Sequence, residues 1–223
     1  MAAACSLLIV ALGGCSPTEQ AHHVKPSGFL SDYSRLRPGE RGEPLLVYLN
    51  PGRDFRAYDK VLVDPVTVWK SPDSTLANVP PQDLEHLAIL LEARIIEAAR
   101  HEGLDIVRQP GPGVMRIRAA LTEAEQSSVK MDIATSVVPL PSFTKLATGT
   151  RAFVGKASIE GEIQDSQSGM VLAAMVDRRA GGRSPEGIRD SWHDVEQAFQ
   201  FWSDRLAYRL CQLRGGTTLC VPP

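Results

Sequence analysis

The chain has 223 residues, of which 43% are hydrophobic and 22% charged, so it can bury a core and is not a disordered polymer. Its 24 Lys and Arg residues against 26 Asp and Glu residues give a formal net charge of −2, which excludes a strongly basic nucleic-acid-binding protein. Four cysteines are too few for a disulfide-dense scaffold, and no apolar run reaches the roughly 18 residues of a membrane-spanning helix.

Residues 1–14 are predicted to be a signal peptide. The uncharged apolar stretch 1–12 would span roughly 18 Å as a helix, which is short of the ~30 Å hydrocarbon core of a bilayer. The sequence Leu12-Gly13-Gly14-Cys15 then resembles a lipobox, in which small residues let the signal peptidase grip extended backbone. The alternative is a buried apolar helix with an incidental cysteine.

The lipobox resemblance implies cleavage between Gly14 and Cys15 and lipidation of Cys15 by a diacylglyceryl group and an acyl chain such as palmitate. One acyl chain holds a protein only marginally, at about 0.8 kcal/mol per buried CH₂, so several chains make a stable anchor. Ser16 after the lipidated cysteine is permissive for the outer membrane. We therefore expect a lipid-anchored protein on the periplasmic face of the outer membrane.

Residues 15–56 are predicted to be the lipidated cysteine, a tether and a lead-in to the fold, because Pro, Gly, Ser and charged residues dominate them. Within this segment, residues 27–36 carry four apolar anchors, namely Phe29, Leu30, Tyr33 and Leu36. Such anchors indicate a strap packed on the domain, and a partner-binding motif is the alternative. Residues 57–223 are predicted to form a single α/β domain.

The first elements of that domain follow from residue type and spacing. Residues 60–69 are rich in β-branched side chains and predict a strand, which Pro65 confines to an edge or interrupts with a bulge. Apolar residues at helical spacing predict a helix over 82–101, stopped by Gly103. Alternating apolar and polar residues predict a strand over 113–123.

The second half of the domain shows a β-hairpin and a long helix. Two apolar stretches, 153–163 and 170–176, flank the turn sequence 165–169 and predict the hairpin. Large apolar residues at helical spacing predict a helix over 190–214. The order β-α-β-β-β-α predicts an α/β (α+β) two-layer sandwich, with a mostly antiparallel sheet and two long helices on one face.

Two glutamates on the predicted hairpin are candidates for paired acid chemistry. Glu160 and Glu162 lie two residues apart, on the polar face of the first strand. They would form a paired acid site only if that face lined a cleft, and nothing in the sequence indicates one.

Cys211 and Cys220 are predicted to form a disulfide. The glycines after the last helix let the tail fold back, and an oxidising periplasm favours the bond. Closing a loop of about ten residues contributes roughly 2–3 kcal/mol in the chain-entropy model. The alternatives are two free thiols or a metal site, and the latter would need two further ligands.

Two regions are candidates for a partner surface. Arg178, Arg179 and Arg183 belong to a basic cluster that could contact lipid headgroups, cell-wall acids or a partner protein, and the alternative is a solvated strand end. The long segment 127–150, with Val138 and Leu140, is the favoured place for an interaction, and the alternative is a strand or short helix.

No coherent catalytic, metal or cofactor motif is found. Ser191, His193 and Asp194 are the residue types of a catalytic triad, but near-neighbours on a helix point in different directions. The flexible pair His22 and His23 would bind metal only weakly. We therefore expect no cofactor and no enzyme activity.

Several segments together resemble a known family. They are the lipobox, Ser27–Tyr33, Tyr58–Val66, the arm Gly169–Asp177, and Trp192 with its helix. Nearly the whole chain is similar to a bacterial lipoprotein family known as domain of unknown function, family thirty-three thirteen. The resemblance implies an envelope lipoprotein of unestablished function, with no catalytic residues to transfer.

The leading hypothesis is a non-enzymatic binding or accessory module, anchored in the membrane by lipid. Its partner would be another envelope protein or a cell-wall component, and no nucleic acid. The alternatives are an envelope enzyme acting on cell-wall or lipid material, and a carrier of an apolar ligand. A carrier predicts a sizeable dry cavity between the sheet and the helices.

Overall fold

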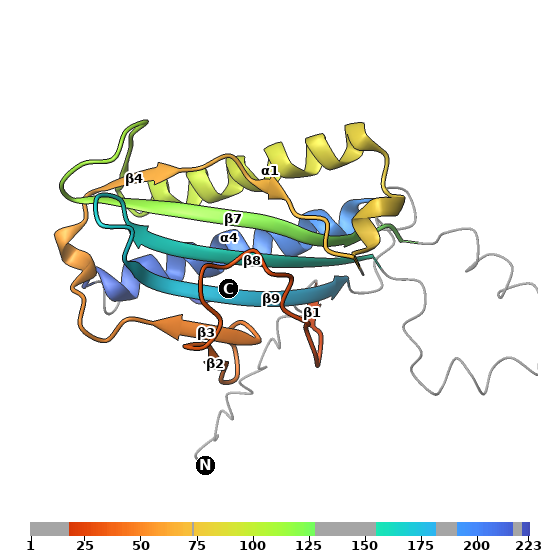
Figure 1. Cartoon of the computed structure of the whole chain (residues 1–223), viewed down its shortest axis with the longest axis horizontal. Coiled ribbons are helices and arrows are strands. Elements are labelled where there is room, and N and C mark those ends of the chain that lie inside the picture. The colour runs from red at the N-terminus through yellow and green to blue at the C-terminus, as the bar shows by residue number, and fades with distance from the viewer. Residues whose placement is uncertain (1–17, 73, 128–154, 182–190, 216–219) are drawn as a thin grey trace, which may run out of the picture.

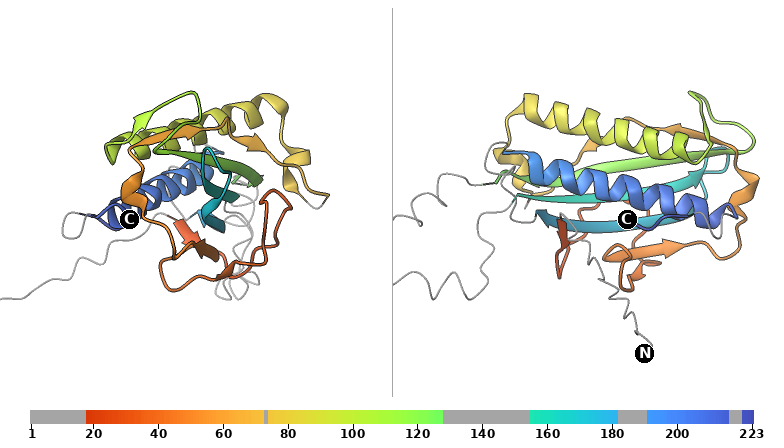
Figure 2. Two further views of the ribbon diagram at one scale, coloured as in Figure 1. Left: turned by 60° about the vertical axis from the view of Figure 1, so that its left-hand side comes forward. Right: turned by 180° about the vertical axis from the view of Figure 1, so that it is seen from behind.

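The computed structural model describes residues 18–72, 74–127, 155–181, 191–215 and 220–223. In this part of the chain, nine strands form one sheet, and two long helices cover one of its faces (Figure 1 and Figure 2). The predicted α/β sandwich is confirmed. In chain order the elements are β1 (Thr18–Gln20), β2 (Arg37–Pro38), β3 (Leu46–Leu49), η1 (Phe55–Ala57), β4 (Lys60–Val63), β5 (Thr67–Val68), η2 (Thr75–Asn78), α1 (Pro81–His101), β6 (Asp105–Ile106), β7 (Val114–Glu125), β8 (Lys156–Asp165), β9 (Val171–Gly181) and α4 (His193–Leu213).

The centre of the sheet is the antiparallel set β7, β8 and β9, and the strand order is β2-β3-β9-β8-β7-β4-β6. The strands β4 and β5 run parallel to β7, as expected when a helix such as α1 connects two neighbouring strands. The gap between β4 and β5 contains Pro65, which has no N–H to donate to a neighbouring strand. The predicted interruption at Pro65 is therefore present.

The sheet also includes residues that were expected to be tether. The strand β1 pairs with β9 through Thr18 and Gly181, and β3 pairs with it from Leu46 opposite Val176. The folded unit therefore begins well before residue 57. The strands β1 and β3 are only three and four residues long, so their own pattern is too short to predict them, and pairing with β9 decides their conformation.

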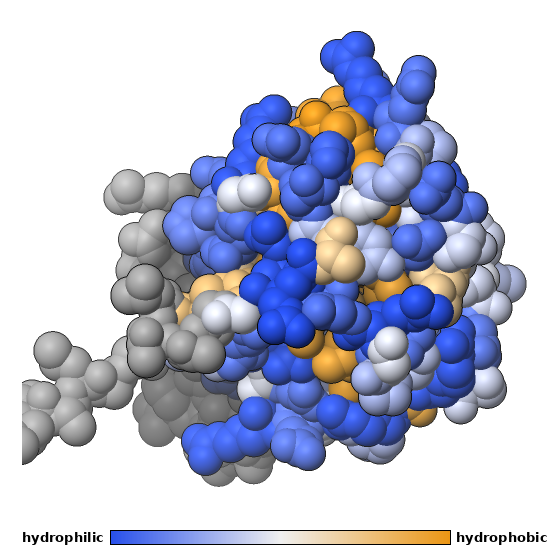
Figure 3. Space-filling model, turned by 90° about the vertical axis from the view of Figure 1, so that its left-hand side faces the viewer, coloured by the Kyte–Doolittle hydropathy of each residue, from blue (hydrophilic) through white to orange (hydrophobic). Residues whose placement is uncertain are grey.

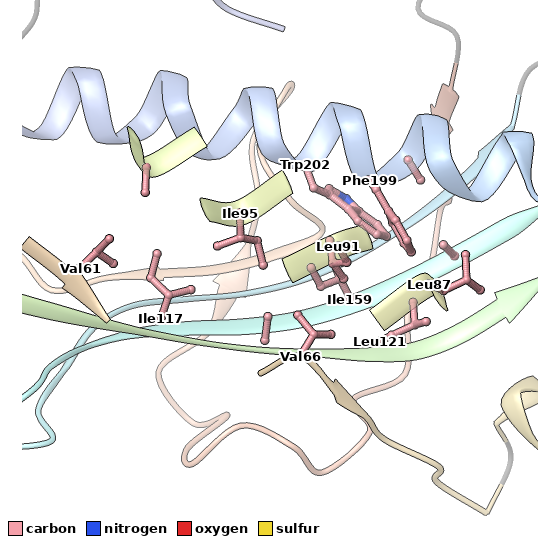
Figure 4. Packing of buried hydrophobic residues seen from close by; sticks show 14 of the residues in the cluster. Val61, Val66, Leu87, Leu91, Ile95, Ile117, Leu121, Ile159, Phe199 and Trp202 are labelled. Carbon is pink, nitrogen blue, oxygen red and sulfur yellow. The ribbon is translucent and has the colours of Figure 1, made fainter. Parts of the chain in front are cut away.

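The helices α1 and α4 bury their apolar faces against the sheet. Figure 4 shows Leu91 of α1 and Phe199 and Trp202 of α4 close to Ile159 of β8. The helix α1 begins with Pro81, whose fixed φ suits the first helical turn, and stops at Gly103, whose φ is +72°. The main core thus lies between the helices and the sheet.

The opposite face of the sheet is covered by the predicted strap, residues 27–36. Figure 1 shows this segment crossing in front of β8. Phe29 and Leu30 are buried in a second apolar cluster with Ala120, Val171 and Val176. The strap prediction is confirmed.

The C-terminal tail is joined to α4 by the predicted disulfide, since Cys211 and Cys220 are bonded with their Cα atoms 5.7 Å apart. Hydrophilic residues cover most of the end of the molecule that carries the β8–β9 turn, and hydrophobic residues form small separate areas there (Figure 3). Within the described ranges, no helix has the length and apolar character needed to cross a membrane.

Candidate functional site: an apolar cavity beneath the last helix

A cavity of about 150 Å³ lies between the helices and the sheet. Its walls come from α1, α4, the three central strands and the strands β2 and β3 beside them. Most of its surface is apolar, and its large lining side chains include Leu91, Ile117, Ile159, Met175, Trp202 and Leu206. An apolar group placed in this cavity would be removed from water, and this removal is what favours the binding of apolar ligands.

Small residues on three neighbouring strands create this space. Ala119, Gly161 and Ala173 line it, and in the sheet Ala119 lies opposite Gly161. A Cβ atom built on Gly161 would meet only the Arg118 carbonyl oxygen at 3.6 Å and Met175 Cε at 3.9 Å, both ordinary contacts. The floor of the cavity is therefore open because side chains are missing there, and α4 does not sink far enough to fill it.

The mouth of the cavity lies between β3 and the C-terminal half of α4. The exposed side chains Leu49 and Arg37 line this side, together with Arg205, Arg209 and Glu43. Glu43 Oε2 is 3.1 Å from Arg37 Nη1, and Glu43 Oε1 is 3.6 Å from Arg209 Nη2. Although partial burial opposes it, hydrogen bonds from Glu40 N–H and Arg37 lower the pKa of Glu43.

Arg205 stands apart from this ion-pair group. Its guanidinium lies 5.7 Å from the Phe201 ring centre and 5.9 Å from that of Tyr208. Its Nε is buried without a hydrogen-bond partner, and within the described residues it makes no ion pair. Burial, followed by the charge of Arg209, lowers the pKa of Arg205. Asp177 and Glu43 are near enough to act on its charge, but among the described residues neither forms an ion pair with it. A partly desolvated cation therefore sits at the mouth of an apolar cavity.

The two candidate glutamates lie on the strap face, and both are buried, Glu160 at 0% and Glu162 at 2% exposure. The backbone N–H of Ser27 and the hydroxyl of Tyr33 donate to Glu160. The hydroxyl of Ser31 donates to Glu162 at 2.8 Å, and Arg118 donates to its other oxygen. The polar face of β8 is therefore buried, because the strap covers it and binds both carboxylates.

The strap also changes the chemistry of Tyr33. Burial raises the pKa of Tyr33, and the hydrogen bond to Glu160 raises it further. The phenol therefore stays protonated and donates to the carboxylate, so it holds the strap to β8. The strap's apolar anchors were visible in the sequence, but its donors Ser27 and Ser31 carried no signal that they would meet glutamates 131 or more residues away.

The structure overturns part of the predicted basic surface. Arg179 is only 5% exposed, donates hydrogen bonds to Thr18 and lies 3.4 Å over the Phe201 ring. Because alternate residues of β9 face α4, Arg179 points into the protein with Asp177. Arg178 faces away from α4, is half-buried, and its Nε lies 2.9 Å from Glu123.

The other predicted site residues are outside the described part of the chain. These are Arg183, Val138 and Leu140 of the expected partner surface, and Gly14 and Cys15 of the lipidation site. Among the residues that the structure describes, no group of three or more His, Cys, Asp or Glu side chains could hold a metal ion.

The fold and the comparisons with known proteins define the class as a bacterial lipoprotein with an α/β sandwich domain. The family model "Protein of unknown function (DUF3313)" matches residues 25–206, so the chain belongs to this family. The chain is similar to the "Uncharacterized lipoprotein YdcL" of Escherichia coli strain K12, with 28% identity over 181 residues, 79% of each protein.

Two solved structures are similar to the chain at a low level. One is a PelC dodecamer from Paraburkholderia phytofirmans, with 12% identity, a TM-score of 0.41, and coverage of 77% of this chain and 96% of that one. The other is a DUF4136 family protein from Bacteroides thetaiotaomicron, with 7% identity, a TM-score of 0.37, and coverage of 77% and 96%. At TM-scores below 0.5, neither carries an argument about function.

Proposed function

We propose that this lipoprotein is a non-enzymatic binding module, lipid-anchored through Cys15 on the periplasmic face of the outer membrane, and that it holds an apolar ligand beneath α4. The observation that carries the proposal is the cavity of about 150 Å³ with its apolar lining. Each buried CH₂ group of a ligand contributes about 0.8 kcal/mol, so even a short alkyl segment gains affinity there.

The size of the cavity limits what it can hold. Apolar cavities of about 150 Å³ bind molecules of the size of benzene, whereas sites for drug-sized molecules measure about 300–1,000 Å³. The cavity therefore suits one segment of an alkyl chain. The rest of the molecule would extend through the mouth beside β3.

The alternative of an envelope enzyme is less well supported. Four acids are buried in the described part of the chain, and protein donors occupy each of them: strap donors bind Glu160 and Glu162, the Trp202 indole binds Asp177, and Ser127 binds Asp194. A general acid or base must reach a proton on its substrate within hydrogen-bond distance. Strap donors at this position instead give the two carboxylates a structural role.

Ligand binding is tested with Trp202, which lines the cavity and reports on it by fluorescence. The full chain carries Cys15→Ala, so that no lipid of its own competes, and Trp69→Phe and Trp192→Phe, so that Trp202 alone emits. An ω-brominated dodecanol is the probe, because bromine quenches tryptophan at close range. We expect saturable quenching, and unquenched emission would contradict the proposal.

Gly161→Val is the matched variant for that experiment, because its Cβ makes only ordinary contacts and its two methyl groups add volume at the floor of the cavity. We expect it to abolish quenching and to raise the free energy of unfolding by about 1 kcal/mol, since a strand glycine is replaced and a void is filled. A more stable protein that no longer binds cannot be explained by misfolding. Quenching that persists in this variant would place the ligand elsewhere.

The anchor is tested separately by Cys15→Ala and membrane fractionation. We expect the unchanged chain in the outer-membrane fraction of a density gradient and the variant in the soluble fraction or as an unprocessed precursor. A processed Cys15→Ala protein that still sediments with the outer membrane would contradict lipidation at this residue.

A further inference from the structure

We infer that the ligand is a single-chain amphiphile with an anionic head group, whose alkyl chain enters the cavity and whose head binds Arg205. The inference rests on the proposed function and adds the chemical class of the ligand. It joins two features of one site: an apolar interior and an unpaired guanidinium at its mouth.

Arg205 has the features of a head-group ligand. An arginine carries five N–H donors in a planar fork, and this fork fits carboxylate and phosphate oxygens. In the described part of the chain, the guanidinium of Arg205 lies near the rings of Phe201 and Tyr208 and beside Gly42, and its buried Nε has no acceptor. A buried donor without a partner is costly, so an arriving anion would satisfy it with a charge-assisted hydrogen bond.

The other charges at the mouth also favour an anion. Arg37, Arg205 and Arg209 line it together with one acid, Glu43. Glu43 lies close to both Arg37 and Arg209, and its charge also acts on Arg205, so a single carboxylate is shared among three arginines. The excess of positive charge creates a potential that attracts an anionic head and repels a cationic one.

The dimensions indicate one alkyl chain. A space of about 150 Å³ holds a single slender segment, and two parallel acyl chains would need a larger site. A single-chain carboxylate or phosphate therefore fits both the interior and the mouth, whereas a diacyl lipid would leave one chain in water. The shared chemistry is an anionic head on one chain.

The test uses the same chain with Trp202 as its only tryptophan and a matched pair of probes, ω-brominated dodecanoate and ω-brominated dodecanol. We expect the carboxylate to bind at least about tenfold more tightly, because only its charged head group accepts a charge-assisted hydrogen bond from the guanidinium. Arg205→Gln should remove this advantage and leave the affinity for the alcohol unchanged. Arg100→Gln, an exposed arginine of α1 away from the cavity, is the control and should change neither affinity.

The outcomes separate the two proposals. Equal binding of both probes, unchanged by Arg205→Gln, would overturn the anionic head and leave the apolar-ligand function standing. Failure of both probes to quench Trp202 would overturn both proposals. Competition of the brominated carboxylate by dodecyl phosphate and by unbrominated dodecanoate then distinguishes the head groups, and stronger competition by either one supports the inference.

Discussion

The two faces of the same sheet are closed in different ways. One face is covered by two 21-residue helices through apolar contacts around Leu91 and Phe199. The other is covered by a short strap, whose apolar residues Phe29 and Leu30 are joined by hydrogen bonds to Glu160 and Glu162.

The two kinds of cover leave different amounts of space on the sheet. The rigid helices bridge small residues on the strands and leave a void beneath α4, because a helix cannot bend locally to follow the sheet. The irregular strap follows the sheet closely and satisfies polar groups one by one. The helix face therefore has room for a ligand, and the strap face depends on specific hydrogen bonds.

The largest loss of stability is expected when a buried side chain on the helix-covered face of the sheet is truncated. Phe199→Ala removes a fully buried ring between α4 and the sheet and should lower the free energy of unfolding by about 3–5 kcal/mol, measured by urea denaturation. Ile89→Ala on the exposed side of α1 is the control and should change it by less than about 0.5 kcal/mol. Similar losses for both variants would mean that the helix face is not the main source of stability.

Removing the disulfide should have the next largest effect, and it also belongs to the helix face. Cys211→Ser opens a loop of about ten residues and should cost about 2–3 kcal/mol under oxidising conditions. Cys220→Ser should cost the same, and the double variant no more than either single one. In the presence of reductant, the free energy of unfolding of the wild-type chain should fall close to that of the variants. If it stays higher, the disulfide is not what stabilises the fold.

The strap face is tested by Glu160→Gln, which keeps the size of the side chain and removes its charge. We expect a loss of about 1–3 kcal/mol, because the buried donors Ser27 N–H and Tyr33 O–H lose a charged acceptor. Hydrogen exchange of the strap amides should rise more than that of α4. If exchange rises equally in the strap and in α4, Glu160 does not act locally on the strap. Glu97→Gln, at an exposed position, is the control and should change neither region.

The smallest effect is a dependence of stability on pH. Because the folded state raises the pKa of Tyr33 above its ordinary value of 10.0, the stability it contributes is present below about pH 10 and is lost as the pH rises through the folded pKa. Tyr33→Phe should therefore reduce the alkaline decline in the free energy of unfolding, by less than about 1 kcal/mol. Burial also raises the pKa of Tyr58, so part of the alkaline decline in stability should remain in this variant. An unchanged alkaline slope would contradict the role of Tyr33.

Much of the framework was predictable from local pattern. Alternation along Val114–Glu125 and the turn at 165–169 predicted the central strands, and apolar spacing predicted both helices within a few residues. The apolar residues Phe29 and Leu30 predicted the strap. These signals are local, since they depend on the side-chain period of a strand or helix.

The candidate site was predictable only in outline. A dry cavity was anticipated for an apolar-ligand carrier, but its position depends on Ala119 lying opposite Gly161 and on Ala173, which pairs with Ile163, lining the same space. Arg205 was not singled out, because one arginine on a helix is ordinary in sequence. Its missing counter-ion is a property of its surroundings.

The sequence by itself determined the two long helices, the strands at the centre of the sheet, the order of these elements, the face that each helix buries and the cysteine pair, because these follow from periodicity and chain proximity. Only the tertiary structure decided what covers each face of the sheet. It buried Glu160, Glu162 and Arg179, recruited β1 and β3 to the edge of β9, and left a void beneath α4. The physical reason is that amphipathic patterning shows which side of an element leaves water, but the partner it meets is set by contacts between residues far apart in the chain.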